Sequence, residues 1–264
     1  MLIHLKSLIE YKELLINFAV KELKIKYKNS ILGFFWSLLN PILSMLVFTV
    51  VFSIFFKSNI PNFPIFILAG LLPWNFFNAT VVGSAVSIIS NAGLIKKVYF
   101  PRELLPVSIA LANMFNFFLE LLVFLLFLVI TGIFAPQYFA VFKYMPYLLI
   151  LLPILFLFSV GFGLLIAALN VYFRDIQHII GILLMVLFYA SPIIYPMEYV
   201  PAKYAPAYML NPLVSIVLSF KNALYWMKAP QLNWIAYSSV AAILTFAFGY
   251  IIFLRLAPDF AEEL

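Results

Sequence analysis

Few side chains in this sequence could take part in chemistry, and their types and spacing argue against an enzyme. Histidine occurs only at His4 and His178, and no pattern brings the two together. Cysteine is absent, which excludes thiolate nucleophiles, disulfides and cysteine-based metal sites. None of the nine glycines precedes a lysine, so the phosphate-binding loop of ATPases is missing, as are HExxH and GxSxG. We therefore expect no catalytic residue, no metal site and no cofactor in this chain.

One carboxylate, Glu120, lies inside a long apolar stretch, NMFNFFLELLVFLLF at 113–127. A carboxylate at membrane depth is paired, turned toward a cavity, or part of an ion path. We favour a structural hydrogen bond to a neighbouring helix, because a lone carboxylate is weak support for ion coupling. A proton or cation pathway through Glu120 stays open as the alternative.

The composition of the chain is that of a membrane protein. Apolar residues make up 66% of the 264 residues and charged residues only 10%, whereas soluble domains average about 45–50% and 25%. The chain cannot hide so much apolar surface in a core of its own, which predicts an all-α integral membrane protein. Residues 1–30 are interrupted by charge every few positions and do not resemble a secretory signal.

Charge-free stretches predict six membrane-spanning helices in one transmembrane domain at 31–264, since a span needs about 20 apolar residues. The expected spans lie near 31–56, 64–90, 104–133, 146–170, 176–196 and 233–254. With a cytoplasmic N-terminus, 11 of the 16 Lys and Arg residues fall on the inner side and 5, Lys221 among them, on the outer side. The positive-inside rule therefore predicts that both termini are cytoplasmic.

The stretch between spans five and six is not a simple loop. Five prolines fall between 191 and 212, and they exclude a long helix. The apolar run LVSIVLSF at 213–220 is too short to span. We expect a re-entrant or interfacial segment on the outer face, with an ordinary extracellular loop as the alternative.

Residues 1–30 predict an amphipathic helix at the cytoplasmic face of the membrane. On a helical wheel Lys21, Lys24 and Lys28 continue one polar stripe, opposite leucine and phenylalanine. Such a helix lies in the headgroup plane, where lysines meet anionic lipid. Anchoring to lipid and docking of a cytoplasmic partner remain open, whereas nucleic acid is not expected because no DNA-binding fold accompanies the lysines.

Four segments, in order along the chain, resemble the polysaccharide-export permeases of ABC transporters. They are YKNSILGFFWSLLNPIL at 27–43, NAGLIKKVYFPRELLPVS at 91–108, NVYFRDIQHI at 170–179 and SPIIYPMEYVP at 191–201. Within the first segment the residues that match the family pattern are Tyr27, Ser30, Leu32, Gly33, Trp36 and Pro41. The resemblance covers nearly the whole chain.

The resemblance implies a transport function without catalysis in this chain. Two copies would form a channel in the cytoplasmic (inner) membrane, and two copies of a separate ATPase subunit would bind ATP and Mg below it. The cargo would be a lipid-linked polysaccharide such as an O-antigen, although teichoic-acid and capsular exporters share the architecture. Alternatives are a permease for a smaller amphiphile or drug, an ion-coupled secondary transporter that uses Glu120, and a membrane enzyme acting on lipid-linked sugars.

The resemblance also implies site residues. The segment that couples to the ATPase would comprise Leu94, Ile95, Lys96, Lys97, Val98, Tyr99, Phe100, Arg102 and Glu103; positive-inside topology alone would explain its lysines but not its apolar cluster. Lys21, Lys24 and Lys28 would hold lipid headgroups or the pyrophosphate of the cargo.

Aromatic rings suit a sugar path, because their faces meet C–H groups and the tips of Tyr and Trp meet hydroxyls. The candidate channel-lining residues are Phe35, Trp36, Trp74, Phe77, Tyr189 and Tyr195, although most rings in such a chain face lipid or pack in the bundle. Gly161 and Gly163 predict close helix packing.

Overall fold

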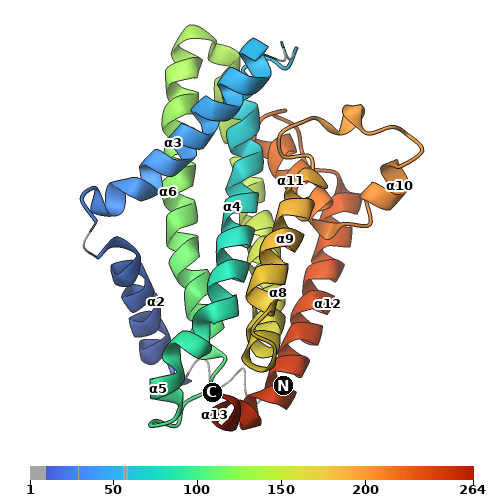
Figure 1. Cartoon of the computed structure of the whole chain (residues 1–264). Helices are drawn as coiled ribbons and strands as arrows, with labels where there is room; N and C mark the ends of the chain where they lie inside the picture. Colours follow the sequence, from blue (N-terminus) through green and yellow to red (C-terminus); the bar gives the residue numbers. More distant parts are fainter. Residues whose placement is uncertain (1–9, 29, 56, 58) are drawn as a thin grey trace.

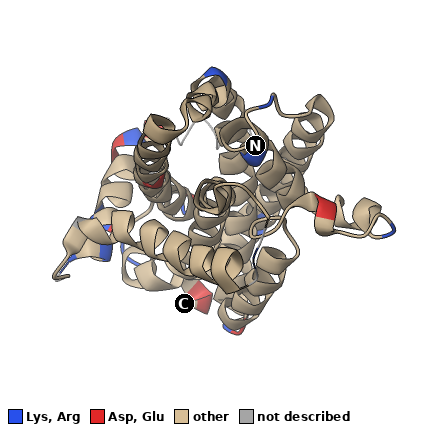
Figure 2. Cartoon of the chain, turned by 90° about the horizontal axis from the view of Figure 1, so that it is seen from above, with Lys and Arg blue, Asp and Glu red and all other residues tan. Residues whose placement is uncertain are grey.

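The chain is a bundle of long helices in which one helix, α4, runs through the middle (Figure 1). The computed structural model describes residues 10–28, 30–55, 57 and 59–264, and these residues contain helices and turns but no strand. Seen end-on, the ribbon carries few charged residues (Figure 2), as the composition requires.

Five segments are long and apolar enough to cross a membrane. They contain α3 (Trp36–Thr49) with the π-helical turn η2 (Val50–Phe55), α4 (Phe63–Ser87), α6 (Leu104–Phe134), α8 (Leu148–Tyr172) and α12 (Leu232–Leu256). Five of the six expected spans are therefore confirmed as long apolar helices. Short helical turns join α6 to α8: η4 (Pro136–Ala140), α7 (Val141–Tyr144) and η5 (Met145–Tyr147).

The fifth expected span, near 176–196, is helical only in α9 (Ile176–Tyr189). At 1.5 Å per residue this helix is about 21 Å long, short of the roughly 30 Å hydrocarbon layer. Ala190 closes the helix through its N–H to Val186 O, and turns follow. Pro192 lacks an N–H and fits this early end. Six full-length spans are therefore not confirmed. The start of α2 (Lys12–Tyr27) and α13 (Phe260–Glu263) nevertheless lie at the same end of the bundle (Figure 1).

The proline-rich stretch after α9 folds back onto the bundle. It contains η6 (Met197–Tyr199), α10 (Ala205–Tyr208) and α11 (Pro212–Leu224). Asn211 caps α11 by accepting a hydrogen bond from Leu213 N at 3.1 Å, and Pro212 occupies the first turn, where no N–H is needed. Eleven residues of α11 are buried, so this short helix belongs to the core of the chain.

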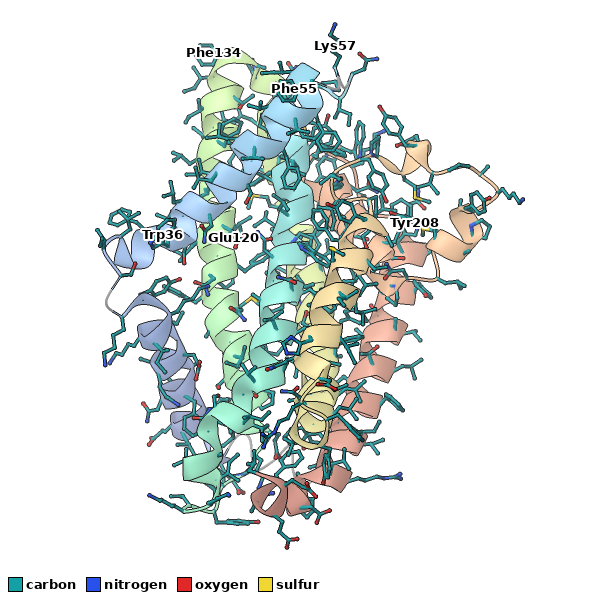
Figure 3. The ribbon with its side chains drawn as sticks, in the orientation of Figure 1. Trp36, Phe55, Lys57, Glu120, Phe134 and Tyr208 are labelled. Carbon is teal, nitrogen blue, oxygen red and sulfur yellow. The ribbon has the colours of Figure 1, made fainter. Side chains whose placement is uncertain are left out.

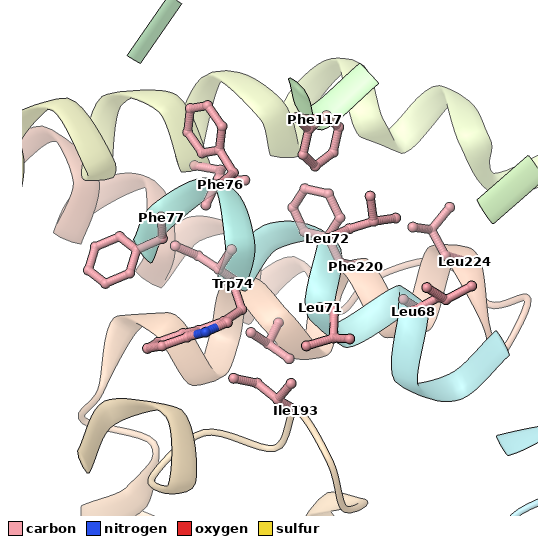
Figure 4. Packing of buried hydrophobic residues seen from close by; sticks show 14 of the residues in the cluster. Leu68, Leu71, Leu72, Trp74, Phe76, Phe77, Phe117, Ile193, Phe220 and Leu224 are labelled. Carbon is pink, nitrogen blue, oxygen red and sulfur yellow. The ribbon is translucent and has the colours of Figure 1, made fainter. Parts of the chain in front are cut away.

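The core forms around α4, in which 18 of 25 residues are buried. Figure 4 shows rings and leucines of α4 meeting Phe117 of α6, Phe220 of α11 and Ile193 of the loop after α9. At α8 and α12 the backbones touch, because a Cβ on Gly249 would lie 2.0 Å from Gly161 O. The sequence prediction of close packing at Gly161 is thus confirmed.

The N-terminal helix α2 (Lys12–Tyr27) leans against α6 at one end of the bundle. Of the expected element at 1–30, residues 1–9 and 29 lie outside the described part of the chain. Only Phe18 and Ala19 of α2 are buried, while Ile16 and Ile25 are more than half exposed. The predicted helix is present, but its apolar side is not fully covered by the bundle.

Candidate coupling surface and translocation path

The segment between α4 and α6 forms a hairpin at the end of the bundle. It runs through η3 (Ile89–Asn91) and α5 (Ala92–Ile95) and returns in an extended stretch to α6. Its tip presents Lys96, Lys97, Val98 and Tyr99, all exposed, with Tyr99 94% exposed. Two cations beside an aliphatic and an aromatic side chain give this tip the mixed character of a protein-docking surface.

Three residues of the predicted coupling segment are instead turned into the chain. Ile95, Phe100 and Glu103 are all buried. Phe100 meets the ring of Phe18 on α2 edge-on, with centroids 5.6 Å apart, and Glu103 lies beside Tyr250 of α12. The physical reason is that an exposed hairpin needs anchors, and these side chains supply them.

Leu94 and Arg102 are half-buried and lie between the anchors and the tip. The Arg102 guanidinium lies over the ring of Phe260, 5.8 Å from its centroid, in the C-terminal α13 (Phe260–Glu263), which follows η7 (Ala257–Asp259). The hairpin is therefore tied to α2, α12 and α13 at once.

The three lysines predicted to meet headgroups do lie together. Lys21, Lys24 and Lys28 line a groove of about 890 Å³ along α2, closed on one side by Phe115 of α6. All three lysines are exposed, and Lys21 also donates a hydrogen bond to Asn91 Oδ1 at 2.6 Å. Lys21 therefore links α2 to the base of the hairpin, a role that the sequence did not indicate.

Two of the six candidate channel residues share one groove. Trp74 of α4 and Tyr189 of α9 line a groove of about 320 Å³ together with Asn78 and Val82. The ring of Phe188 packs edge-on against Trp74, with ring centroids 5.3 Å apart. An aromatic groove of this kind suits the C–H faces of a sugar.

The other candidates lie elsewhere. Phe77 is fully buried and stacked on Phe158, so it faces the core of the chain and not a path; α4 is surrounded on that side by α8. Tyr195 bonds to Tyr208 Oη at 2.7 Å and to Tyr189 O, in the loop after α9. Phe35 and Trp36 are exposed where α3 begins. Trp36 lies on the opposite edge of the molecule from Tyr208 (Figure 3).

Sequence reasoning missed a polar cluster between α2, α3, α4 and α6. Tyr27 donates a hydrogen bond to Asn116 Oδ1 at 2.6 Å and is also bonded to Ser37. One turn along α6, Glu120 accepts a hydrogen bond from Asn75 Nδ2 at 2.9 Å, so the expected hydrogen bond to a neighbouring helix is present. The asparagine spacing, 75 and 78 on α4 and 113 and 116 on α6, is the signal that could have revealed the cluster.

Below this cluster a cavity of about 340 Å³ lies between α2, α4 and α6. Glu22, Lys26, Asn78, Asn113 and Asn116 contribute its polar lining. The surrounding protein desolvates the ammonium of Lys26 and lowers its pKa, and attraction by the Glu120 carboxylate offsets part of this shift. The cavity therefore combines amides with one cation and one anion.

A bundle of long apolar helices, with a basic and aromatic hairpin at one end and no phosphate-binding loop in its sequence, has the architecture of the membrane subunit of a transporter. The family model described as "ABC-2 type transporter" matches residues 14–225, and the chain belongs to this family. The resemblance noted in the sequence is thus confirmed.

Similar proteins agree with this family assignment. The chain is 36% identical over 98% of both chains to the "O-antigen export system permease protein RfbA" of Myxococcus xanthus. It is 32% identical, over 96% of this chain and 95% of the relative, to a protein of the same name in Klebsiella pneumoniae. It is 27% identical, over 82% and 84% of the two chains, to the "Polysialic acid transport protein KpsM" of Escherichia coli.

Proposed function

We propose that this chain is the channel-forming permease subunit of an ATP-driven exporter that moves a lipid-linked polysaccharide out across the cytoplasmic membrane. The observation that carries the proposal is its 36% identity, over nearly the whole of both chains, to an O-antigen export permease. The proposal includes a homodimer with six crossings per chain, α9 and the loop after it serving as the fifth, and both termini in the cytoplasm.

The packing of one chain supports a channel built from two copies. The residues around α4 fill the middle of the bundle, so one chain leaves no room there for a polymer. The groove with Trp74 and Tyr189 instead lies at the surface, between α4 and α9. A second copy facing this surface would enclose a path lined by aromatic rings, with contacts weak enough for a sugar chain to slide.

Energy would come from an ATPase that docks on the hairpin tip. We assign the docking contacts to Lys96, Lys97, Val98 and Tyr99, because these side chains are exposed. Movement of the tip would reach α2 through the Phe18–Phe100 contact and the Lys21–Asn91 hydrogen bond. ATP and Mg would be bound by the partner.

The lysine groove on α2 would receive the lipid end of the cargo. Lys24 and Lys28 offer exposed ammonium groups beside the apolar Phe115, a combination that suits a headgroup or pyrophosphate attached to a hydrocarbon chain.

The test is to purify this chain with the ATPase encoded beside its gene, in lipid, and to measure association and ATP turnover. Lys97→Glu and Tyr99→Ala should weaken the complex and reduce turnover at least about tenfold, which corresponds to about 1.4 kcal/mol. Lys203→Glu and Tyr204→Ala are matched controls. Lys203 and Tyr204 are also exposed, but they lie in the loop before α10. The proposed docking site is wrong if both pairs of variants behave alike, and the ATP-driven function is wrong if no ATPase associates at all.

A further inference from the structure

Two hollows of the chain share two residues of α4. The aromatic groove toward α9 and the polar cavity toward α2 and α6 are both lined by Asn78 and Val82. These two residues are one turn apart on α4, so they form a single ridge between the hollows. A ligand that crosses this ridge from one hollow to the other passes Asn78 and Val82.

The amide of Asn78 is half-buried and has no hydrogen-bond partner among the described residues, whereas the three nearby asparagines are all hydrogen-bonded. Asn75 donates to Glu120, and Asn113 donates to Thr80 Oγ1 at 3.5 Å. Asn116 donates to Ala112 O at 3.3 Å. An amide offers two donors and one acceptor, and leaving them unsatisfied inside a membrane protein is costly. We therefore expect the Asn78 amide to hydrogen-bond water or a polar ligand.

The surroundings of Asn78 select the kind of ligand. The cavity side carries one cation, Lys26, and one anion, Glu22. Their charges cancel, so the cavity does not favour an anionic ligand. On the groove side stand the rings of Trp74 and Tyr189. Donors, acceptors and aromatic faces around a net neutral hollow match the hydroxyl edges and C–H faces of an uncharged sugar unit.

We propose that Asn78 hydrogen-bonds the hydroxyls of an uncharged sugar unit as it passes between the polar cavity and the aromatic groove. This inference rests on the proposed export function and adds a named contact that selects hydroxyl-rich cargo. Asn78 acts here as a binding residue of the path and has no role in ATP hydrolysis.

The first test measures export in cells that carry this chain, its ATPase and their own surface glycan, with the gene replaced by variants. Asn78→Leu should slow the appearance of surface glycan about tenfold, while Asn78→Gln, which keeps an amide, should slow it less than about threefold. Asn222→Leu is the matched control: Asn222 is also half-buried but lies in the last turn of α11 and lines neither hollow.

Wild-type rates in Asn78→Leu would overturn the inference, as would an equal loss in Asn222→Leu. If the wild-type chain itself exports no glycan, the proposed function fails and the inference falls with it. Export in the wild type with an unaffected Asn78→Leu rejects the sugar contact alone.

The second test uses the natural absence of cysteine. A hydrophilic maleimide should label Asn78→Cys in the lipid-embedded complex at least about tenfold faster than Leu244→Cys, since a thiol exposed to water ionises more readily than one in hydrocarbon. Leu244 is 63% exposed on the outside of α12. Labelling of Asn78→Cys should be slower when removal of ATP stalls glycan in the complex than when the complex comes from cells that make no glycan. Equal labelling of the two variants, or no protection by glycan, would contradict the inference.

Discussion

Among single residues, Lys221 departs most clearly from the exposed position that its sequence suggests. The sequence places it among the outer charges, yet it is only 1% exposed. Its Nζ donates to Pro192 O at 2.5 Å and Ile193 O at 2.8 Å and lies 3.4 Å from the centroid of the Phe66 ring. Lys221 therefore fastens the loop after α9 to the core.

Lys221→Met should destabilise the chain, because it leaves two buried carbonyls without a donor. Each unsatisfied group costs roughly 1–3 kcal/mol, partly offset by removal of a buried amine. The measurement is the unfolding temperature of the purified protein in detergent. Lys203→Met, at an exposed lysine, should leave it unchanged. Equal unfolding temperatures for the wild type and Lys221→Met would contradict the fastening role.

Glu120 allows a prediction that separates a structural role from an ion-coupling role. Glu120→Gln keeps a carbonyl oxygen to accept from Asn75, so ATP-driven export should fall by less than about threefold. Glu120→Leu removes the acceptor and should destabilise the contact between α4 and α6 by roughly 1–3 kcal/mol. Export and thermal stability are measured with and without an ionophore. Loss of export in Glu120→Gln, or in the wild type with the ionophore, would favour the secondary transporter.

At the scale of elements, the α8–α12 crossing depends on two glycines. A Cβ at position 249 would lie 2.0 Å from Gly161 O, and one at 161 would lie 2.5 Å from the Phe246 Cα. Both obstacles are backbone, which cannot swing aside as a side chain can. The two helices can touch only while both positions lack a side chain.

Gly249→Ala should therefore force α8 and α12 apart and cost about 1–3 kcal/mol. Gly181→Ala in α9 is the matched control, since nothing lies within 4 Å of its Cβ. Alanine also has the higher helix propensity, so Gly181→Ala should be neutral or stabilising by up to about 1 kcal/mol. Thermal unfolding of both variants decides, and a Gly249→Ala protein as stable as the wild type would refute the packing described.

The elements divide into those that charge spacing can predict and those that it cannot. Charge-free stretches predicted α4, α6 and α12 to within a few residues, because burial in hydrocarbon excludes charge along a whole span. The early end of α9 was missed because an apolar run continues past Ser191 and Pro192 and hides the turn.

The candidate site was less predictable, because its burial depends on contacts between distant segments. The sequence suggests that Phe100 is exposed, because it lies in a basic loop. In the structure it packs against Phe18, which lies 82 positions earlier in the chain. Likewise, apolar periodicity does not distinguish Phe77, which faces the core, from Trp74, which lines a groove. The asparagines at 113 and 116 and the glutamate at 120, each about one turn apart on α6, did carry a spacing signal, which composition alone obscures.

At the scale of the whole molecule, the packed middle of one chain leads to a prediction of stoichiometry. The proposed path lies between chains, so the particle in lipid should contain two copies of this chain and two ATPase subunits. Native mass spectrometry of the purified complex gives the count directly. A particle with a single copy of this chain that still exports glycan would require a path through the bundle and would contradict the arrangement proposed.

The measurement that tests the central claim most directly is glycan translocation in sealed vesicles that contain only this chain and its ATPase. Lipid-linked glycan is supplied on the ATPase side, and glycan that reaches the opposite side is detected with a lectin. We expect transfer that requires ATP and Mg, persists when ion gradients are dissipated, and is lost in Lys97→Glu but not in Lys203→Glu. Transfer that follows an ion gradient without ATP, or no transfer of glycan by a stable and ATP-hydrolysing complex, would contradict this claim.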